Sequence, residues 1–317
     1  MEHLCYLCDP ANPHRVVSYD TDAISLRFPK RFVGPPGRAH GGMSVASLMC
    51  PALREASENG VAHAIVRKVS GRLHMPVPLD ETMSADVTVT DEGYRVVIAA
   101  GDATVVSGTV EIGSRRVGIG DMIQDVPESL LGPLTEALRL ADIDLSGPTL
   151  QERFFENCKV AGYHPGSNVC FGCSETPEAL QLFNRVTPDG SLWTRWRTEP
   201  AFVDSPGQLA FSITAASLDC SNLWILNKDD VERRLPGGKF FITGSFSVHF
   251  LRVPPIKMSN NYRVVARPLR TEGRKGHTMS ALLDETGVVY AIAESTAILI
   301  DTPEELILKK LEDVCHS

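Results

Sequence analysis

The stretch RAHGGMSVASLM (residues 38–49) decides the fold, because a comparable stretch, DSPGQLAFSITA (residues 204–215), stands in the second half of the chain. His40 and Ser205, within these stretches, each follow the second cysteine of a Cys-x-x-Cys pair by 32 residues. Two related stretches at one offset predict two copies of a single structural unit.

A second pair of matching motifs supports the repeat. HMPVPL (residues 74–79) in the first half corresponds to LRVPPI (residues 251–256) in the second, and a strand-like run follows each. We expect an N-terminal unit at 1–113, a helical connector at 114–168 and a C-terminal unit at 169–317. Two units also suit a chain of 317 residues, since domains usually contain roughly 100–200 residues.

Each unit is predicted to contain one long helix and a run of strands. The helices are expected at 43–57 and 209–226, and Pro51 should interrupt or shift the first of them. The connector is expected to form helices at 128–142 and 149–160. Alternating, β-branched residues predict strands at 63–73, 83–90, 96–100 and 103–112 in the first unit and at 240–251, 262–268, 277–283 and 288–300 in the second.

The overall composition excludes several classes of protein. A net charge of −8 and a pI of about 5.6 argue against nucleic acid and against an acidic membrane surface as partners. No apolar run approaches the roughly 20 residues of a membrane helix, and the first residues lack the pattern of a secretory signal. Eight cysteines are too few for a disulfide scaffold. We expect a cytoplasmic protein with mostly reduced thiols.

Four motifs occur in an informative order: AHGG (39–42) before a helix, CFGC (170–173), FLRVPP (250–255) and ALLDETGVVYAIAEST (281–296). They resemble the acyl-CoA thioesterase-like superfamily with the hotdog fold, of the PaaI/TesB type. The resemblance covers most of the second half, less of the first half and none of the connector. It implies an α+β double hotdog, in which two antiparallel sheets each wrap a long central helix. It also implies an acyl thioester, on coenzyme A or on an acyl carrier, as substrate.

Thioester hydrolysis needs donors that stabilise an oxyanion and a base that activates water. Gly41 and Gly42 open the first helix, where unpaired N–H groups and the positive end of the helix dipole are found. Glycine lets a carbonyl oxygen approach this backbone closely. We interpret the pair as an oxyanion hole; the alternative is a tight turn only. His40 is predicted to contact substrate or to cap the helix.

The resemblance also implies a carboxylate about two turns inside the hotdog helix. The first helix has Met49 and Cys50 at that distance, whereas the second has Asp219, one turn farther along, in an apolar run. Burial there would raise the pKa of a carboxyl group and suit a general base; the alternative is a structural carboxylate with local bonds. In dimers of this family the helix start of one subunit faces the acid of the other. We therefore expect one composite site, in which Gly41 and Gly42 meet Asp219.

Other polar residues are candidates for substrate binding. Asp204 and Ser205 precede the second helix, which Asp204 alternatively caps. Arg270, Arg274 and Lys275 flank a glycine-rich turn and are candidates to hold the phosphates of coenzyme A. The alternative for these three cations is solvated surface charge.

The two Cys-x-x-Cys pairs raise the question of a zinc site. Four thiolates would close a tetrahedral site, but the pairs lie far apart in the sequence and recur as part of the repeat. We therefore expect no metal and no cofactor. Cys50 and Cys220, on the two helices, are interpreted as buried structural thiols.

These observations predict hydrolysis of an acyl thioester, with Asp219 activating water and the Gly41/Gly42 helix start binding the oxyanion. Two alternatives stay open. One is a non-catalytic protein that binds an acyl group or another small molecule. The other is a biosynthetic hotdog enzyme of the cyclase or dehydratase type, of which the dehydratase is disfavoured because no histidine closely follows Asp204. A homodimer of double hotdogs is also expected.

Overall fold

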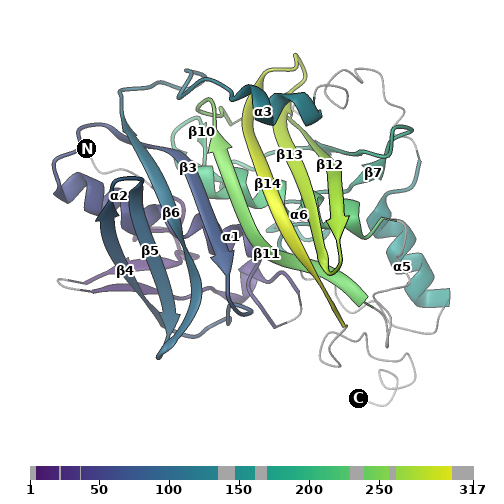
Figure 1. The fold of residues 1–317 in the computed structure, drawn as a ribbon, viewed down its shortest axis with the longest axis horizontal. Helices are drawn as coiled ribbons and strands as arrows, with labels where there is room; N and C mark the ends of the chain where they lie inside the picture. Colours follow the sequence, from purple (N-terminus) through teal and green to yellow (C-terminus); the bar gives the residue numbers. More distant parts are fainter. Residues whose placement is uncertain are drawn as a thin grey trace.

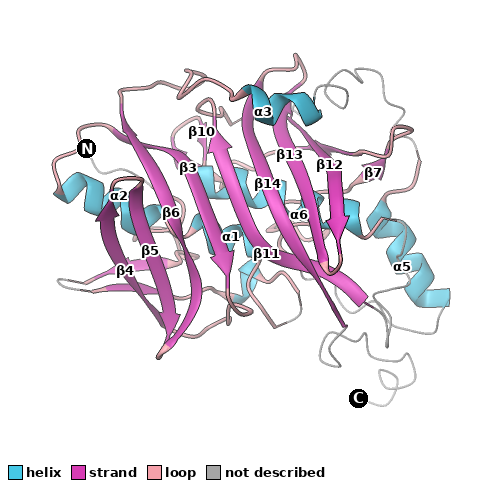
Figure 2. Cartoon of the chain, in the orientation of Figure 1, coloured by secondary structure: helices cyan, strands magenta, loops and turns pink. Residues whose placement is uncertain are grey.

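The structure, a computed structural model, describes residues 5–20, 23–35, 37–134, 147–160, 170–228, 239–256 and 262–301 (Figure 1). Its main feature is a broad antiparallel sheet with helices packed against it (Figure 2). The first half contributes β1 (Val17–Tyr19), β2 (Ile24–Leu26), β3 (Ala64–Leu73), β4 (Met83–Thr90), β5 (Gly93–Ala100) and β6 (Ala103–Ser114). The second contributes β7 (Arg185–Val186), β8 (Leu192–Trp196), β11 (Lys239–Phe250), β12 (Tyr262–Glu272), β13 (Lys275–Asp284) and β14 (Val289–Asp301). Two short strands of the second half, β9 (Val203–Ser205) and β10 (Gln208–Leu209), pair with each other outside this sheet. In the first half, the 3-10 helix η1 (Lys30–Phe32) follows β2.

The strand order is the same when read from either edge of the sheet. The twelve strands follow the order β1-β2-β4-β5-β6-β3-β11-β14-β13-β12-β8-β7. Each half therefore begins with two short strands at its edge, continues with three consecutive strands, and ends with the strand that follows its central helix. This order is what two copies of one unit would produce. The division at residues 113/114 and 168/169 stays a prediction.

Strands β3 and β11 join the two halves into one continuous sheet. They pair antiparallel at its centre, where Ser70 lies opposite Ser247 and their hydroxyl oxygens are 2.8 Å apart. This pairing satisfies backbone groups that would otherwise form two open sheet edges. The expectation of two sheets, each wrapping its own helix, is thus not confirmed in that form, because one sheet spans both halves.

The predicted strands are otherwise confirmed, with one notable extension. Strand β12 continues past Pro268, where the prediction ended, to Glu272. Its register with β13 shifts between Pro268 and Arg270, and a bulge is one of the few places where a strand tolerates proline. Pro268 also lies beyond the part of β12 that pairs with β8, so no N–H is needed there to bond β8.

The first central helix is divided in two. Helix α1 (Gly41–Ala46) and helix α2 (Met49–Glu58) are separated at Ser47 and Leu48. Pro51 explains the division, because it has no N–H to donate to the Ser47 carbonyl four residues earlier and its ring crowds that carbonyl. The interruption predicted from Pro51 is confirmed, and it falls one turn before the proline.

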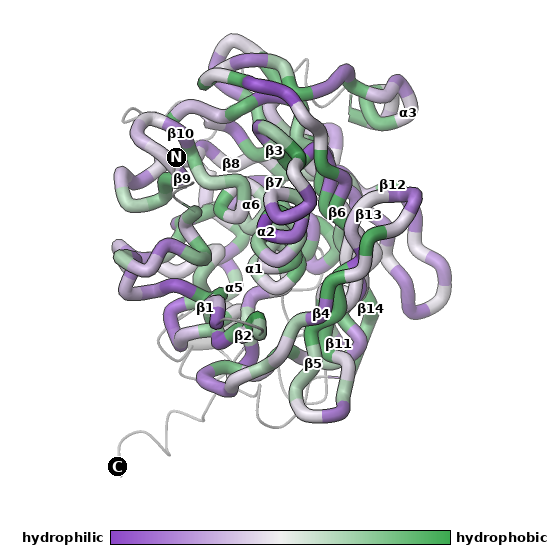
Figure 3. Tube along the Cα trace, turned by 90° about the vertical axis from the view of Figure 1, so that its left-hand side faces the viewer, coloured by the Kyte–Doolittle hydropathy of each residue, from purple (hydrophilic) through white to green (hydrophobic). Residues whose placement is uncertain are grey.

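The second central helix, α6 (Phe211–Leu226), is enclosed on almost all sides. It packs against β8 and β11 to β14 of its own half and against α1 of the other half. In the side view, α1, α2 and α6 lie to one side of strands β4, β5, β11 and β14 (Figure 3). Side chains from both halves form one continuous hydrophobic core around these helices. Because the helix is buried all round, its few polar side chains must find partners inside the protein.

The connector is helical where the structure describes it. Helix α3 (Glu128–Leu131) and the 3-10 helix η2 (Gly132–Leu134) begin the helix predicted at 128–142, whose remainder lies outside the described residues. Helix α5 (Leu150–Val160) confirms the second prediction. It begins with a reciprocal cap, in which Thr149 and Glu152 each accept the other's backbone N–H, at 3.0 and 2.6 Å. Within the described residues, no helix is long and apolar enough to span a membrane.

Candidate active site

Asp219 lies two turns inside α6. The central helices begin at Gly41 and Phe211, so Asp219 occupies the ninth position of its helical run, as Met49 does in the first half. The side chain is fully buried. The carboxylate therefore stands at the depth that the family resemblance implies, and the one-turn displacement expected from the sequence is absent.

The alignment of Ser205 with His40 is wrong. His40 is the residue before α1, and the residue at the same place before α6 is Ala210. Ser205 belongs instead to β9, which turns through Gly207 into β10 before the helix begins. Gly207 has a φ of +80°, a value that favours glycine in such a turn. This small hairpin adds residues ahead of α6, which shifted the alignment based on a constant 32-residue offset.

The Asp219 carboxylate is held by donors from both halves of the chain. The Gly42 N–H of α1 donates to Oδ2 at 2.8 Å, and the Thr243 hydroxyl of β11 donates to Oδ1 at 2.9 Å. Hydrogen bonds to an ionised carboxylate are stronger than neutral ones. The structure thus brings the start of the first helix and Asp219 together. The catalytic roles assigned to them stay predictions.

Both glycines are needed for this close approach. A Cβ atom on Gly41 would lie 2.6 Å from Thr243 Oγ1, and one on Gly42 would lie 2.7 Å from the Asp219 Cβ. The same Gly42 Cβ would be 3.0 Å from the Cα of Ala216. Backbone atoms cannot retreat as a flexible side chain can, so a larger residue at 42 would push α1 away from α6.

Burial raises the pKa of Asp219 above its ordinary value. The nearby His40 ring, the Thr243 hydroxyl and the Gly42 N–H act in the opposite direction, because each favours the charged carboxylate. Desolvation is the larger effect. An ionised carboxylate in this environment is a stronger base than a carboxylate in water. General base catalysis requires such a base.

His40 lies beside this carboxylate. Its side chain is 4% exposed, and its Nδ1 is 3.8 Å from Asp219 Oδ2. Nδ1 has no hydrogen-bond partner among the described residues, and the ring packs edge-on against Phe171. The side chain does not cap α1, so the capping alternative is excluded. The Gly42 N–H that a cap would satisfy is taken by Asp219 instead.

The N–H groups of Gly41 and Gly42 differ in whether they already make a hydrogen bond. Among the described residues, no acceptor takes its hydrogen bond, whereas the Gly42 N–H is already engaged. Of the two amides proposed from the sequence for an oxyanion hole, Gly41 is therefore the one with a hydrogen bond left to give.

Asp204 and Ser205 lie near the start of α6 rather than at Asp219. Asp204 accepts the N–H of Phe211, the first residue of α6, at 3.0 Å, and the N–H of Tyr6 at 2.8 Å. It therefore caps the helix from outside the usual position, as the alternative interpretation expected. The Ser205 hydroxyl lies 3.2 Å from the Gln208 side-chain oxygen. A role of either residue in substrate binding stays a prediction.

Arg270, Arg274 and Lys275 occupy the exposed end of the β12–β13 hairpin. Arg270 forms an ion pair with Glu272 at 2.6 Å, and Arg274 donates to the Leu299 carbonyl. Arg270 also lines a cavity of about 470 Å³ at the β3–β11 junction, together with other polar side chains of the sheet. The residues that line it include none of those around Asp219. The structure does not bring these cations to the carboxylate, and their role in phosphate binding stays a prediction.

The six cysteines whose side chains the structure describes form two groups instead of one four-thiolate site. Cys5 and Cys8 lie next to Cys50 of α2, with their three sulfurs within 4.8 Å of one another. In the other half, hydrogen bonds from Cys173 and Cys220 lower the pKa of the Cys170 thiol. Among the described residues, the four sulfurs of the two Cys-x-x-Cys pairs do not gather at one point.

Thr243 contacts Asp219 but was not predicted from the sequence. It lies on β11, 24 residues after Asp219 and within a strand that was predicted. The sequence pattern was consistent with burial of Thr243, because Phe241 and Thr243 are two residues apart in the strand and therefore lie on the same face, where both are buried. A hydroxyl on the buried face of a strand needs a partner, and Asp219 is that partner.

Comparisons with known proteins identify the fold. No protein-family model and no curated protein matches the sequence. Among solved structures, the chain is similar to a putative thioesterase from Novosphingobium aromaticivorans, with 16% identity, a TM-score of 0.53 and coverage of 91% of this chain and 99% of that one. It is similar to the acyl-CoA thioesterase II TesB2 from Mycobacterium marinum, with 14% identity, a TM-score of 0.52 and coverage of 91% and 96%.

A third similar structure is the pyran synthase domain from module nine of the sorangicin pathway, with 12% identity, a TM-score of 0.50 and coverage of 90% of this chain and 97% of that one. At these identities the likeness concerns the fold. It agrees with the repeated strand order and with the two central helices packed on a large antiparallel sheet. The chain therefore shares the fold of these structures, which is the hotdog fold.

Proposed function

We propose that the protein hydrolyses an acyl thioester at the junction of its two halves. The observation that carries the proposal is the buried Asp219 carboxylate, which the Gly42 N–H and the Thr243 hydroxyl hold beside the start of the first helix. A desolvated carboxylate, next to an amide N–H that has no acceptor within the described part of the chain, supplies a base and an oxyanion donor in one small region. The fold shared with named thioesterases agrees with this assignment.

The proposed reaction uses water as the nucleophile. Asp219 takes a proton from water while the water oxygen bonds to the thioester carbon. The Gly41 N–H donates to the oxygen that becomes negative, and Gly42 keeps the carboxylate in place. The carbon–sulfur bond then breaks, and Asp219 returns the proton to the leaving sulfur. The products are a carboxylic acid and a thiol, so atoms and protons balance.

His40 is proposed to position the substrate. Its buried Nδ1 lacks a hydrogen-bond partner among the residues that the structure describes and lies near Asp219, so a polar group that enters the site would satisfy it. The carboxylate has no exposed surface, so a thioester reaches it only when the side chains around it move aside. Such opening on substrate binding is common in enzymes that exclude water from their sites.

The test is the substitution Asp219→Asn, which keeps the shape of the side chain but removes the base. Loss of a general base typically lowers the rate by roughly 10²–10⁴-fold, so kcat for the best substrate in an acyl-CoA and acyl-carrier panel should fall by that factor. A matched control is Asp284→Asn, because Asp284 is also a buried carboxylate but lies in the β13–β14 turn. The control should keep its turnover. Near-full turnover in the Asp219 variant contradicts the assignment.

A second candidate function is non-catalytic binding of an acyl thioester or a similar small molecule. The complete burial of Asp219 and the engagement of both its oxygens favour this alternative, since the carboxylate would then only clamp α1 to α6. Calorimetry with acyl-CoA and a non-hydrolysable analogue distinguishes the two. Binding without any thioester cleavage supports this alternative, whereas conversion to a product other than acid and thiol supports the biosynthetic one.

A further inference from the structure

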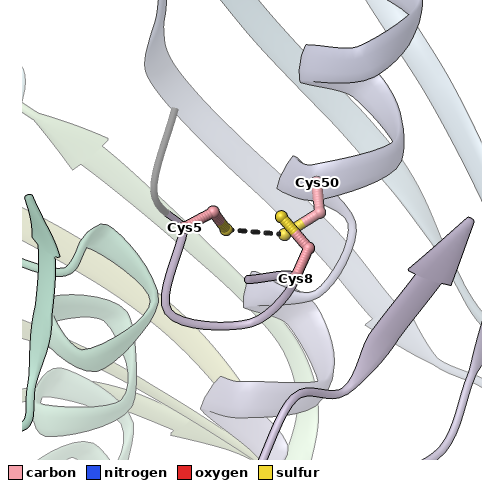
Figure 4. Close-up of side chains that lie close together, drawn as sticks. All are labelled: Cys5, Cys8 and Cys50. Atoms are coloured by element: carbon pink, nitrogen blue, oxygen red, sulfur yellow. Dashed lines mark hydrogen bonds between the residues drawn. The ribbon is translucent and has the colours of Figure 1, made fainter. Parts of the chain in front are cut away.

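Three cysteines that are far apart in the sequence meet at the edge of the first half. Cys5 and Cys8 come from a loop, and Cys50 comes from the first turn of α2 (Figure 4). The Cys5 and Cys50 sulfurs are 3.2 Å apart, and all three sulfurs lie within 4.8 Å of one another. The close-up shows the three side chains pointing toward a common centre (Figure 4).

The loop that carries the first two cysteines is built by backbone hydrogen bonds. The N–H groups of Cys8 and Asp9 both donate to the Cys5 carbonyl, at 3.0 and 2.8 Å. This turn places the two thiols on the same side of the loop without a disulfide between them. The geometry therefore does not depend on a disulfide, and it presents two sulfurs toward Cys50.

The spacing of the sulfurs fits a tetrahedral metal ion. At a zinc–sulfur distance of about 2.3 Å, neighbouring sulfurs of a tetrahedron are about 3.8 Å apart. The Cys5–Cys50 separation of 3.2 Å is shorter than this value, and no separation among the three exceeds 4.8 Å, so shifts of up to about 1 Å would suffice. Soft thiolates select zinc over magnesium or calcium. Cys5 and Cys8 are only half-buried, which leaves a path for an ion to enter.

We propose that Cys5, Cys8 and Cys50 bind one Zn²⁺ ion, with a fourth position open to solvent. Binding forms three zinc–sulfur bonds and releases the remaining thiol protons to water. In the sequence, the two Cys-x-x-Cys pairs are the candidate ligands of a single site, for which no metal is expected. The third ligand is not apparent there, because only the fold brings Cys50 of α2 to the first pair.

The ion would link the N-terminal loop to α2. Tyr6, between the two loop cysteines, packs against Phe32 and Phe202, and its N–H bonds to Asp204 ahead of α6. The loop thus touches both halves of the protein. Zinc at the three thiols would stabilise this contact, because the three ligands come together only in the folded chain. The role is independent of the proposed hydrolysis.

The experiment uses the full chain, purified anaerobically with a reductant and stripped of metal. Titration with Co²⁺ should give thiolate-to-cobalt charge-transfer absorption, and Zn²⁺ should displace the cobalt and raise the melting temperature. Cys50→Ser should lower the number of bound cobalt ions by one. Loss of a ligand should weaken binding more than the roughly 10–100-fold that follows loss of an outer-shell partner.

Two further variants complete the design. Cys8→Ser removes a half-buried ligand and replaces the first variant if Cys50→Ser does not fold. Cys220→Ser, the matched control, removes a buried thiol from the corresponding place in α6 and should keep the ion bound at the first cluster. The proposal is overturned if reduced protein binds no cobalt, or if Cys8→Ser and Cys50→Ser bind as wild type does. A Cys5–Cys50 disulfide in the isolated protein, with no metal uptake after reduction, overturns it equally.

Discussion

Replacing Gly42 with alanine should separate the two central helices. The new Cβ would lie 2.7 Å from the Asp219 Cβ, 3.0 Å from the Ala216 Cα and 3.2 Å from the Ala215 carbonyl oxygen. Two of these three atoms belong to the backbone of α6, which is packed against the sheet and cannot yield locally. Helix α1 must therefore shift, and the bond from the Gly42 N–H to Asp219 must lengthen.

Two costs add to give the expected loss of stability. Forcing an extra methyl group into a packed core costs about 1–3 kcal/mol. Weakening a buried hydrogen bond to a charged group costs about 1.5–3 kcal/mol more. The free energy of unfolding should therefore fall by roughly 2.5–6 kcal/mol, a large share of the ~5–15 kcal/mol that holds most native proteins together. At about 2–4 °C per kcal/mol, the melting temperature should fall by at least about 5 °C.

The assay is urea denaturation of Gly42→Ala beside a matched control, Gly132→Ala. Gly132 has a φ of −48° in the helical region, and a Cβ there meets no atom of the described residues within 4 Å. The control should be neutral or more stable by about 0.4–1 kcal/mol, because alanine restricts the unfolded chain. A Gly42→Ala protein within about 0.5 kcal/mol of wild type would refute the argument that this glycine is required by the approach of α1 to α6.

Three other outcomes follow from the contacts around Asp219. Because the base must be ionised and burial raises the pKa of Asp219 above 3.8, kcat/KM for a thioester should rise with pH through that raised pKa, and Asp219→Asn should abolish this limb of the pH–rate profile. The raised pKa also means that ionisation of Asp219 lowers the free energy of unfolding. The stability contributed by the protonated carboxyl group is complete below pH 3.8 and is lost as the pH rises through the raised pKa. The difference in stability between wild type and Asp219→Asn should therefore vary with pH in that window. Thr243→Val removes the donor to Asp219 Oδ1, so stability should fall by about 1.5–3 kcal/mol and the acid limb should move to higher pH. Thr243→Ser keeps the hydroxyl and should restore both; equal behaviour of the two variants would exclude the hydrogen bond as the cause.

The sequence by itself determined the local structure and the repeat. Alternation of β-branched residues located the eight long strands, and the apolar run around Asp219 located α6, because both signals depend on side-chain periodicity within a few turns. Pro51 predicted the break in the first helix, since the missing N–H acts only on the preceding turn. The hotdog fold could be inferred from the order of these elements together with a few motifs.

Only the tertiary structure decided which distant residues meet. Gly42 and Asp219 are 177 residues apart, and their bond depends on how α1 packs across α6. The same holds for Thr243 and for Cys50 beside the first cysteine pair, because each contact requires a particular register and packing depth. The β9–β10 hairpin also escaped the alignment, since inserted residues change the spacing without changing the pattern around them. Side-chain periodicity specifies which face is buried, whereas the partner on that face is chosen by packing of the whole chain.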